Sequence, residues 1–305
     1  MYDKVAFFGA SVTQQQNGFC RYFSSMNPDV QVRVFGYGAM HLNDAGVIYI
    51  DHVLQYKPDY CFIDWFSTGY IEYNKHDFND IKQYIDTIIH QFTKHKIKII
   101  FLTFPHRGTN RFTNEPIDKS AIYKKMNDYI RSYDIPVIDL SEAFDNLDLI
   151  LRDNVHTSDL GSQEYARLIS NDFNANIRGK VGLPSKFPDE NMFCNIRSTD
   201  INTIVKDSIT FEGLADVVGI SQKIGPYTGL LRINNKIHNN WDKWCYYERD
   251  MINLKFNISD VCKIEVLQDS FDTSECKHQI NWCDQKLLKL YKCYYVGDIS
   301  NIVCR

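Results

Sequence analysis

A serine near the amino terminus and an aspartate–histidine pair far downstream have the types and order of a nucleophile and its base. Ser11 follows an apolar run, residues 5–8 (VAFF), and a turn of small residues. Asp153 and His156 form an Asp-x-x-His pattern just before an expected helix, so their side chains can approach each other across one turn. The carboxylate could then orient the imidazole, whose free nitrogen would take the proton from the attacking serine. These three residues predict acyl chemistry at Ser11.

A plainer explanation exists for Ser11 alone, because a serine after a strand often caps the next helix. The catalytic interpretation is favoured by the matching acid and base, which lie on a second loop. An apolar run without polar residues is typical of a central strand in a parallel sheet, and open α/β folds place their ligands at the carboxyl edge of such a sheet.

Short strands alternating with helices of ten or more residues predict how this edge is built. The pattern indicates one doubly wound α/β domain over residues 1–180, with about five parallel strands and right-handed crossovers. We expect the strands at residues 5–8, 30–35, 60–63, 97–104 and 135–140, and the helices at residues 17–26, 42–56, 77–95, 117–133 and 158–173.

The remainder of the chain has a different character. A segment rich in glycine and proline, residues 179–188, precedes short β-like runs that turn residues separate, so residues 185–305 predict a smaller all-β domain, sandwich-like. Its expected strands are residues 208–211, 217–221, 230–233, 254–258, 262–267 and 286–296. The aromatic residues Trp241, Trp244, Tyr246 and Tyr247 could stack against sugars, or they could serve core packing or a domain interface.

Composition excludes several classes of function. A formal net charge of −4 and a pI near 6.1 give no electrostatic footprint for nucleic acid, and no apolar run approaches the length of a membrane span. No signal peptide is expected, so nine cysteines are interpreted as reduced thiols in a cytoplasmic protein. Cys276, His278 and Cys283 lie close in sequence but match no standard zinc spacing, and we expect no metal and no cofactor.

The sequence resembles the SGNH (GDSL-type) hydrolase family over about its first 175 residues. Residues 8–11 (FGAS) match the first block of the family, and residues 38–39 (GA) match the glycine of the second. Residues 153–161 (DNVHTSDLG) match the last block, which ends in a helix. The first and last blocks occur in the right order on the right expected elements, which makes the resemblance fairly specific.

The resemblance implies an oxyanion hole built from the backbone N–H groups of Ser11 and Gly38. A third donor in the family is an asparagine after the third strand. Residues 66–69 (FSTG) occupy that position here, so the asparagine is missing; Thr68 is the expected replacement, with Ser67 as the alternative. Asp64 and Trp65, beside this altered block, are expected to line the substrate pocket.

These observations predict a serine esterase that removes an O-acetyl or similar short acyl group from a sugar or glycan. The substrate class rests on the family resemblance. Two alternatives remain open at this point. One is an O-acyltransferase that uses the same three residues, and the other is a glycan-binding protein whose catalysis has decayed.

Overall fold

The computed structural model describes residues 2–66, 78–107, 120–242, 244–269, 273–274, 276 and 282–305. The chain divides into two compact units, Met1–Cys194 and Asn195–Arg305. Among the described residues, no helix has the length and apolarity that a membrane crossing requires.

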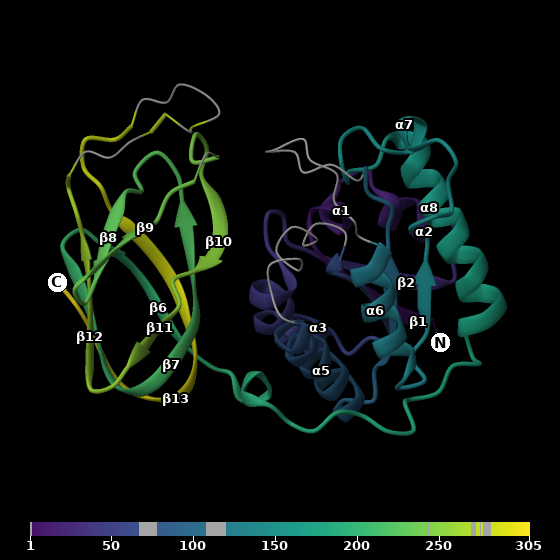
Figure 1. Ribbon diagram of the computed structural model, residues 1–305, viewed down its shortest axis with the longest axis horizontal. Helices are drawn as coiled ribbons and strands as arrows, with labels where there is room; N and C mark the ends of the chain where they lie inside the picture. Colours follow the sequence, from purple (N-terminus) through teal and green to yellow (C-terminus); the bar gives the residue numbers. More distant parts are fainter. Residues whose placement is uncertain are drawn as a thin grey trace. The chain divides into compact units, whose positions relative to one another are not determined.

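The first unit is built on a five-stranded parallel sheet, which confirms the predicted α/β fold (Figure 1). The strand order is β2-β1-β3-β4-β5. The chain therefore leaves β1 toward one edge of the sheet and returns to its other side, so the strand order reverses at β1, and in such folds ligands bind at the carboxyl ends of the strands beside this reversal. The bounds are β1 Asp3–Gly9, β2 Val30–Gly36, β3 Tyr60–Asp64, β4 Lys98–Thr103 and β5 Val137–Asp139.

A helix is found at each of the five expected positions, one of them with an irregular start, and two short helices that were not expected add to them. The expected helix over residues 42–56 begins as a π-helical turn, Leu42–Gly46, and becomes α-helical only in α3, Ile50–Tyr56. The other helices are α1 Ser11–Gln14, α2 Phe19–Met26, α5 Phe78–Lys94, α6 Ser120–Arg131, α7 Leu147–Ile150 and α8 Asp159–Asp172, followed by a π-helical turn, Phe173–Ile177.

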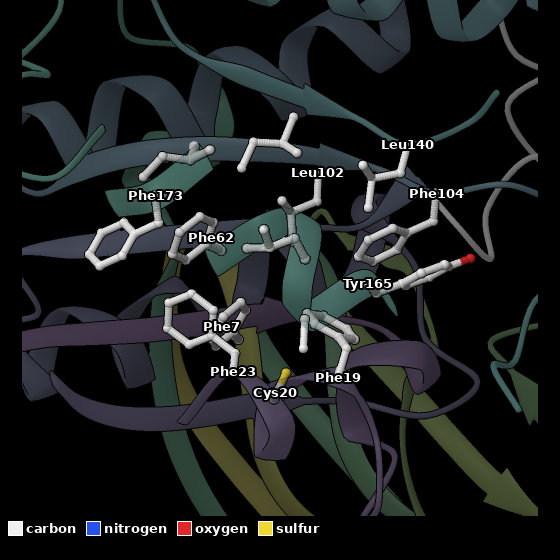
Figure 2. Packing of buried hydrophobic residues seen from close by; sticks show 14 of the residues in the cluster. Phe7, Phe19, Cys20, Phe23, Phe62, Leu102, Phe104, Leu140, Tyr165 and Phe173 are labelled. Atoms are coloured by element: carbon white, nitrogen blue, oxygen red, sulfur yellow. The ribbon is translucent and has the colours of Figure 1, made fainter. Parts of the chain in front are cut away.

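Aromatic side chains form the core between the sheet and helices α2 and α8 (Figure 2). Phe7 of β1 lies at its centre. Its ring is 4.9 Å from that of Phe62, and 5.4 and 5.1 Å from those of Phe19 and Phe23. This packing fixes β1, and therefore the start of α1, against the rest of the unit.

The division between the units falls after Cys194, beyond the segment at residues 179–188 that is expected from the sequence to link them. The chain after residue 180 contacts α5, where His90 Nδ1 lies 3.0 Å from the Pro188 carbonyl oxygen and Gln91 donates to the carbonyl of Cys194 over 2.8 Å. These hydrogen bonds explain why residues 185–194 belong to the first unit. Glycine and proline mark an irregular segment, but they do not show what it packs against.

The second unit is all-β, as predicted, and is one antiparallel sheet of eight strands (Figure 1). The strand order is β6-β13-β7-β12-β8-β9, and β10 and β11 also pair with β7. All eight strands are thus connected by hydrogen bonds, unlike the two separate sheets of a simple sandwich. The bounds are β6 Arg197–Val205, β7 Ser208–Ile224, β8 Leu230–Ile233, β9 Lys236–Asn239, β10 Arg249–Asn253, β11 Phe256–Ile258, β12 Val261–Val266 and β13 Leu288–Cys304.

Candidate active site

Ser11 is the first residue of α1 and follows β1 after a single intervening residue, Ala10. The Ala10 N–H donates to the carbonyl of Asp64 at the end of β3 over 3.0 Å, so the turn is tied to the neighbouring strand. Because β1 lies between β2 and β3, Ser11 stands at the point of the sheet edge where the strand order reverses. The plainer capping explanation does not apply, since the cap position of α1 is Ala10 and no side chain caps it.

A continuous chain of hydrogen bonds joins Ser11, His156 and Asp153. Ser11 Oγ lies 2.7 Å from His156 Nε2, and His156 Nδ1 lies 2.8 Å from Asp153 Oδ2. An ionised carboxylate can only accept, so Nδ1 carries the proton and Nε2 is left to accept from the serine hydroxyl. The side chains of His156 and Asp153 are 23% and 51% exposed, so solvent reaches both.

The loop that carries His156 is folded around the Asp153 carboxylate. Asp153 Oδ1 accepts from the backbone N–H groups of Val155 and His156, over 2.9 and 2.8 Å. An isolated bridge between Leu151 and Thr157 closes the loop. Asp153 therefore orders the backbone with one oxygen and holds the imidazole with the other.

The same contacts decide the ionisation of Asp153. Partial burial by itself raises the pKa of this carboxyl. The hydrogen bonds from the His156 ring and from the backbone N–H groups of Val155 and His156 outweigh that effect, so the pKa of Asp153 lies well below its usual range. Asp153 is consequently a carboxylate at neutral pH, as the orientation of the imidazole requires.

Gly38 approaches Ser11 closely. A Cβ atom at Gly38 would lie 3.9 Å from Ser11 Cβ and 2.3 Å from Gln14 Oε1, so a side chain at this position would require the Gln14 amide to move. The predicted second oxyanion residue thus lies beside the predicted nucleophile. Thr68, the predicted third donor, lies outside the described residues, as does Ser67 next to it.

Asp64 and Trp65 do not line an open pocket, which corrects the role expected for them. Asp64 is 1% exposed, and its Oδ2 accepts from Thr13 Oγ1 of α1 over 2.8 Å. Trp65 is fully buried, with its ring 5.0 Å from that of Phe8. Asp64 is the last residue of β3 and binds α1, and Trp65 follows it and packs in the core, so neither side chain is open to a substrate.

Sequence reasoning missed two residues that hold this arrangement, Thr13 and Gln15. Thr13 is 1% exposed and binds Asp64, as described above. Gln15 forms hydrogen bonds with Thr157, the residue after His156. Their only signal in the sequence is that they follow Ser11 within about one helical turn, which does not reveal their partners.

The described residues hold no group of three or more histidine, cysteine or acidic side chains placed to bind a metal ion. Cys276 and Cys283, considered above for zinc, are free thiols, whereas His278 lies outside the described residues. The aromatic residues Trp241, Trp244, Tyr246 and Tyr247 lie in the second unit, where Tyr247 is 47% exposed.

No protein-family model matches the sequence. No curated protein matches it either. Among solved structures, the chain is similar to a two-domain esterase active on acetylated mannans, co-crystallised with mannopentaose, with a TM-score of 0.62, 13% identity, and coverage of 98% of this chain and 92% of that one. It is also similar to a lipase/acylhydrolase from Enterococcus faecalis, with a TM-score of 0.51, 20% identity, and coverage of 59% of this chain and 100% of that one. At these identities the likeness establishes the fold, which this chain shares with known esterases and acylhydrolases.

Proposed function

We propose that this protein is a serine esterase in which Ser11 is the nucleophile, His156 the general base and Asp153 the residue that orients the base. One observation carries the proposal, namely the chain of hydrogen bonds from Ser11 Oγ through the His156 ring to Asp153, over 2.7 and 2.8 Å. Ser11 at the start of α1 meets two residues of a distant loop in the order that proton transfer needs, at the sheet edge where α/β folds bind ligands.

The geometry supports a two-step reaction. Ser11 Oγ attacks the acyl carbon while its proton passes to His156 Nε2, and the ester C–O bond then breaks as the alcohol leaves with that proton. A water molecule, deprotonated by the same nitrogen, then attacks the acyl carbon, and the bond from that carbon to Ser11 Oγ breaks as Nε2 returns the proton to Oγ, which releases the acid. Asp153 stays ionised throughout and stabilises the imidazolium that forms in each step.

The backbone N–H groups of Ser11 and Gly38 are the proposed donors to the oxyanion. The close approach of Gly38 to Ser11 supports this assignment. A donor aimed at the developing negative charge contributes about 3 kcal/mol to stabilisation of the transition state. Thr68 remains the proposed third donor, and its contribution would be measured with Thr68→Val, which removes the hydroxyl and keeps the shape.

The proposed substrate is a short acyl ester, foremost an O-acetyl group, on a sugar or glycan. Its support is the likeness to the esterase active on acetylated mannans, which extends over both units of this chain. Hydrolysis is proposed over transfer to another alcohol because the similar two-domain structure is that of an esterase, and the partly exposed His156 and Asp153 leave water access to the site.

The test uses the full chain with 4-nitrophenyl acetate and with acetylated mannan. We expect acetate release from both, and a loss of at least about 10³-fold in kcat for Ser11→Ala. Addition of free mannose as an acceptor would leave acetate as the main product. An unchanged kcat in Ser11→Ala would contradict the proposed nucleophile, and acetyl-mannose as the main product would favour the acyltransferase.

A further inference from the structure

The side-chain amide of Gln15 bridges the two segments that carry the proposed nucleophile and base. Gln15 Oε1 accepts from the backbone N–H and from the hydroxyl of Thr157, each over 3.2 Å. Gln15 Nε2 donates to the Thr157 carbonyl oxygen over 3.3 Å. One amide thus forms three hydrogen bonds to one residue, across 142 positions of sequence.

The bridge joins residues that directly neighbour the proposed catalytic ones. Gln15 directly follows α1, which begins with Ser11, and Thr157 directly follows His156. Among the described residues, the hydrogen bonds between residues 11–15 and residues 153–158 are these three and the bond from Ser11 to His156. Besides the bond from Ser11 to His156 itself, the three hydrogen bonds of Gln15 are therefore what holds these two segments at the distance observed between Ser11 Oγ and His156 Nε2.

We propose that Gln15 is a positioning residue, which holds the loop of His156 in register with Ser11 for the reaction. The inference rests on the proposed function, since positioning matters only if His156 takes the proton from Ser11. Thr157 is a firm anchor for the bridge because it is 2% exposed and its hydroxyl also lies 2.6 Å from Ser162 Oγ.

The chemistry of the bridge requires an amide. Gln15 accepts two hydrogen bonds and donates one, which a carboxylate of the same shape cannot do because it has no donor. In Gln15→Glu the second carboxylate oxygen would face the Thr157 carbonyl oxygen, and the two would repel. Protonation of that glutamate restores a donor, so the defect of this variant should diminish in acid.

The chain supplies its own control in the next residue. Gln16 is exposed and has no hydrogen bond to any described residue. We compare Gln15→Ala and Gln15→Glu with Gln16→Ala and Gln16→Glu in the full chain, using kcat and KM for 4-nitrophenyl acetate and the rate at which a fluorophosphonate modifies Ser11. Thermal unfolding of each variant reports whether the fold is intact.

We expect kcat and the rate of Ser11 modification to fall by about 10- to 100-fold in both Gln15 variants, with KM nearly unchanged, because a misplacement of about 1 Å is enough for such a loss. The Gln16 variants should match the wild type. The ratio of kcat/KM between Gln15→Glu and Gln15→Ala should rise as the pH falls toward the carboxyl pKa of about 4.3. A purely structural role would move the melting temperature and leave this ratio constant.

Failure of this inference is distinct from failure of the proposed function. If the wild type neither hydrolyses the ester nor reacts with the fluorophosphonate, the esterase assignment fails. If the wild type does both and the Gln15 variants equal the Gln16 variants, the positioning role is overturned and the esterase remains. Should Gln15→Ala unfold, Gln15→Glu decides the matter, because it conserves the volume of the side chain.

Discussion

Replacement of Asp153 by asparagine tests how the carboxylate serves the imidazole. Asp153 Oδ1 accepts from two backbone N–H groups, those of Val155 and His156, and so an oxygen must remain on that side. The amide NH₂ of the introduced asparagine would then face His156 Nδ1, which must become an acceptor. The ring proton is consequently forced onto Nε2, and His156 donates to Ser11 instead of accepting its proton.

The structure sets the size of the effect. In a triad with a buried aspartate, this change lowers kcat by about 10⁴-fold. Here the Asp153 side chain is 51% exposed, so water can compete for Nδ1 and relieve part of the constraint. We therefore expect a loss of about 10³-fold in kcat, which corresponds to about 4 kcal/mol of transition-state stabilisation.

Asp153→Ala is the matched comparison. It removes the carboxylate but leaves room for a water molecule that can accept from Nδ1, so the productive tautomer survives. We expect Asp153→Asn to be at least as impaired as Asp153→Ala when kcat of both variants is measured with 4-nitrophenyl acetate in the same neutral buffer. Wild-type kcat in Asp153→Asn, or a smaller defect than in Asp153→Ala, would refute the reasoning about the tautomer.

Three predictions concern stability. Gly161→Ala should destabilise the protein by about 1–3 kcal/mol in urea unfolding, because its Cβ would lie 2.0 Å from the Ile150 carbonyl oxygen; an unchanged midpoint would contradict the close packing of α7 on α8. Phe7→Ala should lower the free energy of unfolding by about 3–5 kcal/mol. Leu149→Ala, at a side chain that is 58% exposed, should change it by no more than about 0.5 kcal/mol. Equal losses in the two variants would contradict the central place of Phe7 in the core. Because the pKa of Asp153 is lowered on folding, its contribution to stability is present above the unfolded value of about 3.9 and is lost as the pH falls through the lower folded value. The stability difference between the wild type and Asp153→Asn should therefore be constant at neutral pH and shrink in acid, and a difference that grows in acid would contradict the lowered pKa.

The α/β unit could be predicted from sequence because its signals are local. Each signal can be read within a short stretch of sequence. Examples are the apolar run of β1, the helical spacing of the segments that follow and the Asp-x-x-His pattern. The proximity of Ser11 and His156 could be predicted because the strands of a parallel sheet present their carboxyl ends, and the loops after them, at the same edge. The structure places their reactive atoms 2.7 Å apart.

The features that the sequence does not predict depend on contacts between distant segments. Trp65 is expected in a pocket wall, but the packing of Phe8 against it buries it. Gln15 looks like an ordinary polar helix end until Thr157 is placed beside it. In the second unit, the sequence predicts a break between residues 211 and 217. Gly213 instead lies inside the long strand β7 with a φ of +143°, where the backbone at Asp298 approaches too closely for a side chain.

The most direct test of the central claim is the covalent modification of the wild-type chain by a fluorophosphonate, followed by peptide mapping. The account predicts a single phosphonylated residue, Ser11, and a rate of modification that falls by at least about 10²-fold in His156→Ala, since the base that activates the hydroxyl is gone. No adduct on Ser11, or equal rates in the wild type and in His156→Ala, would contradict it.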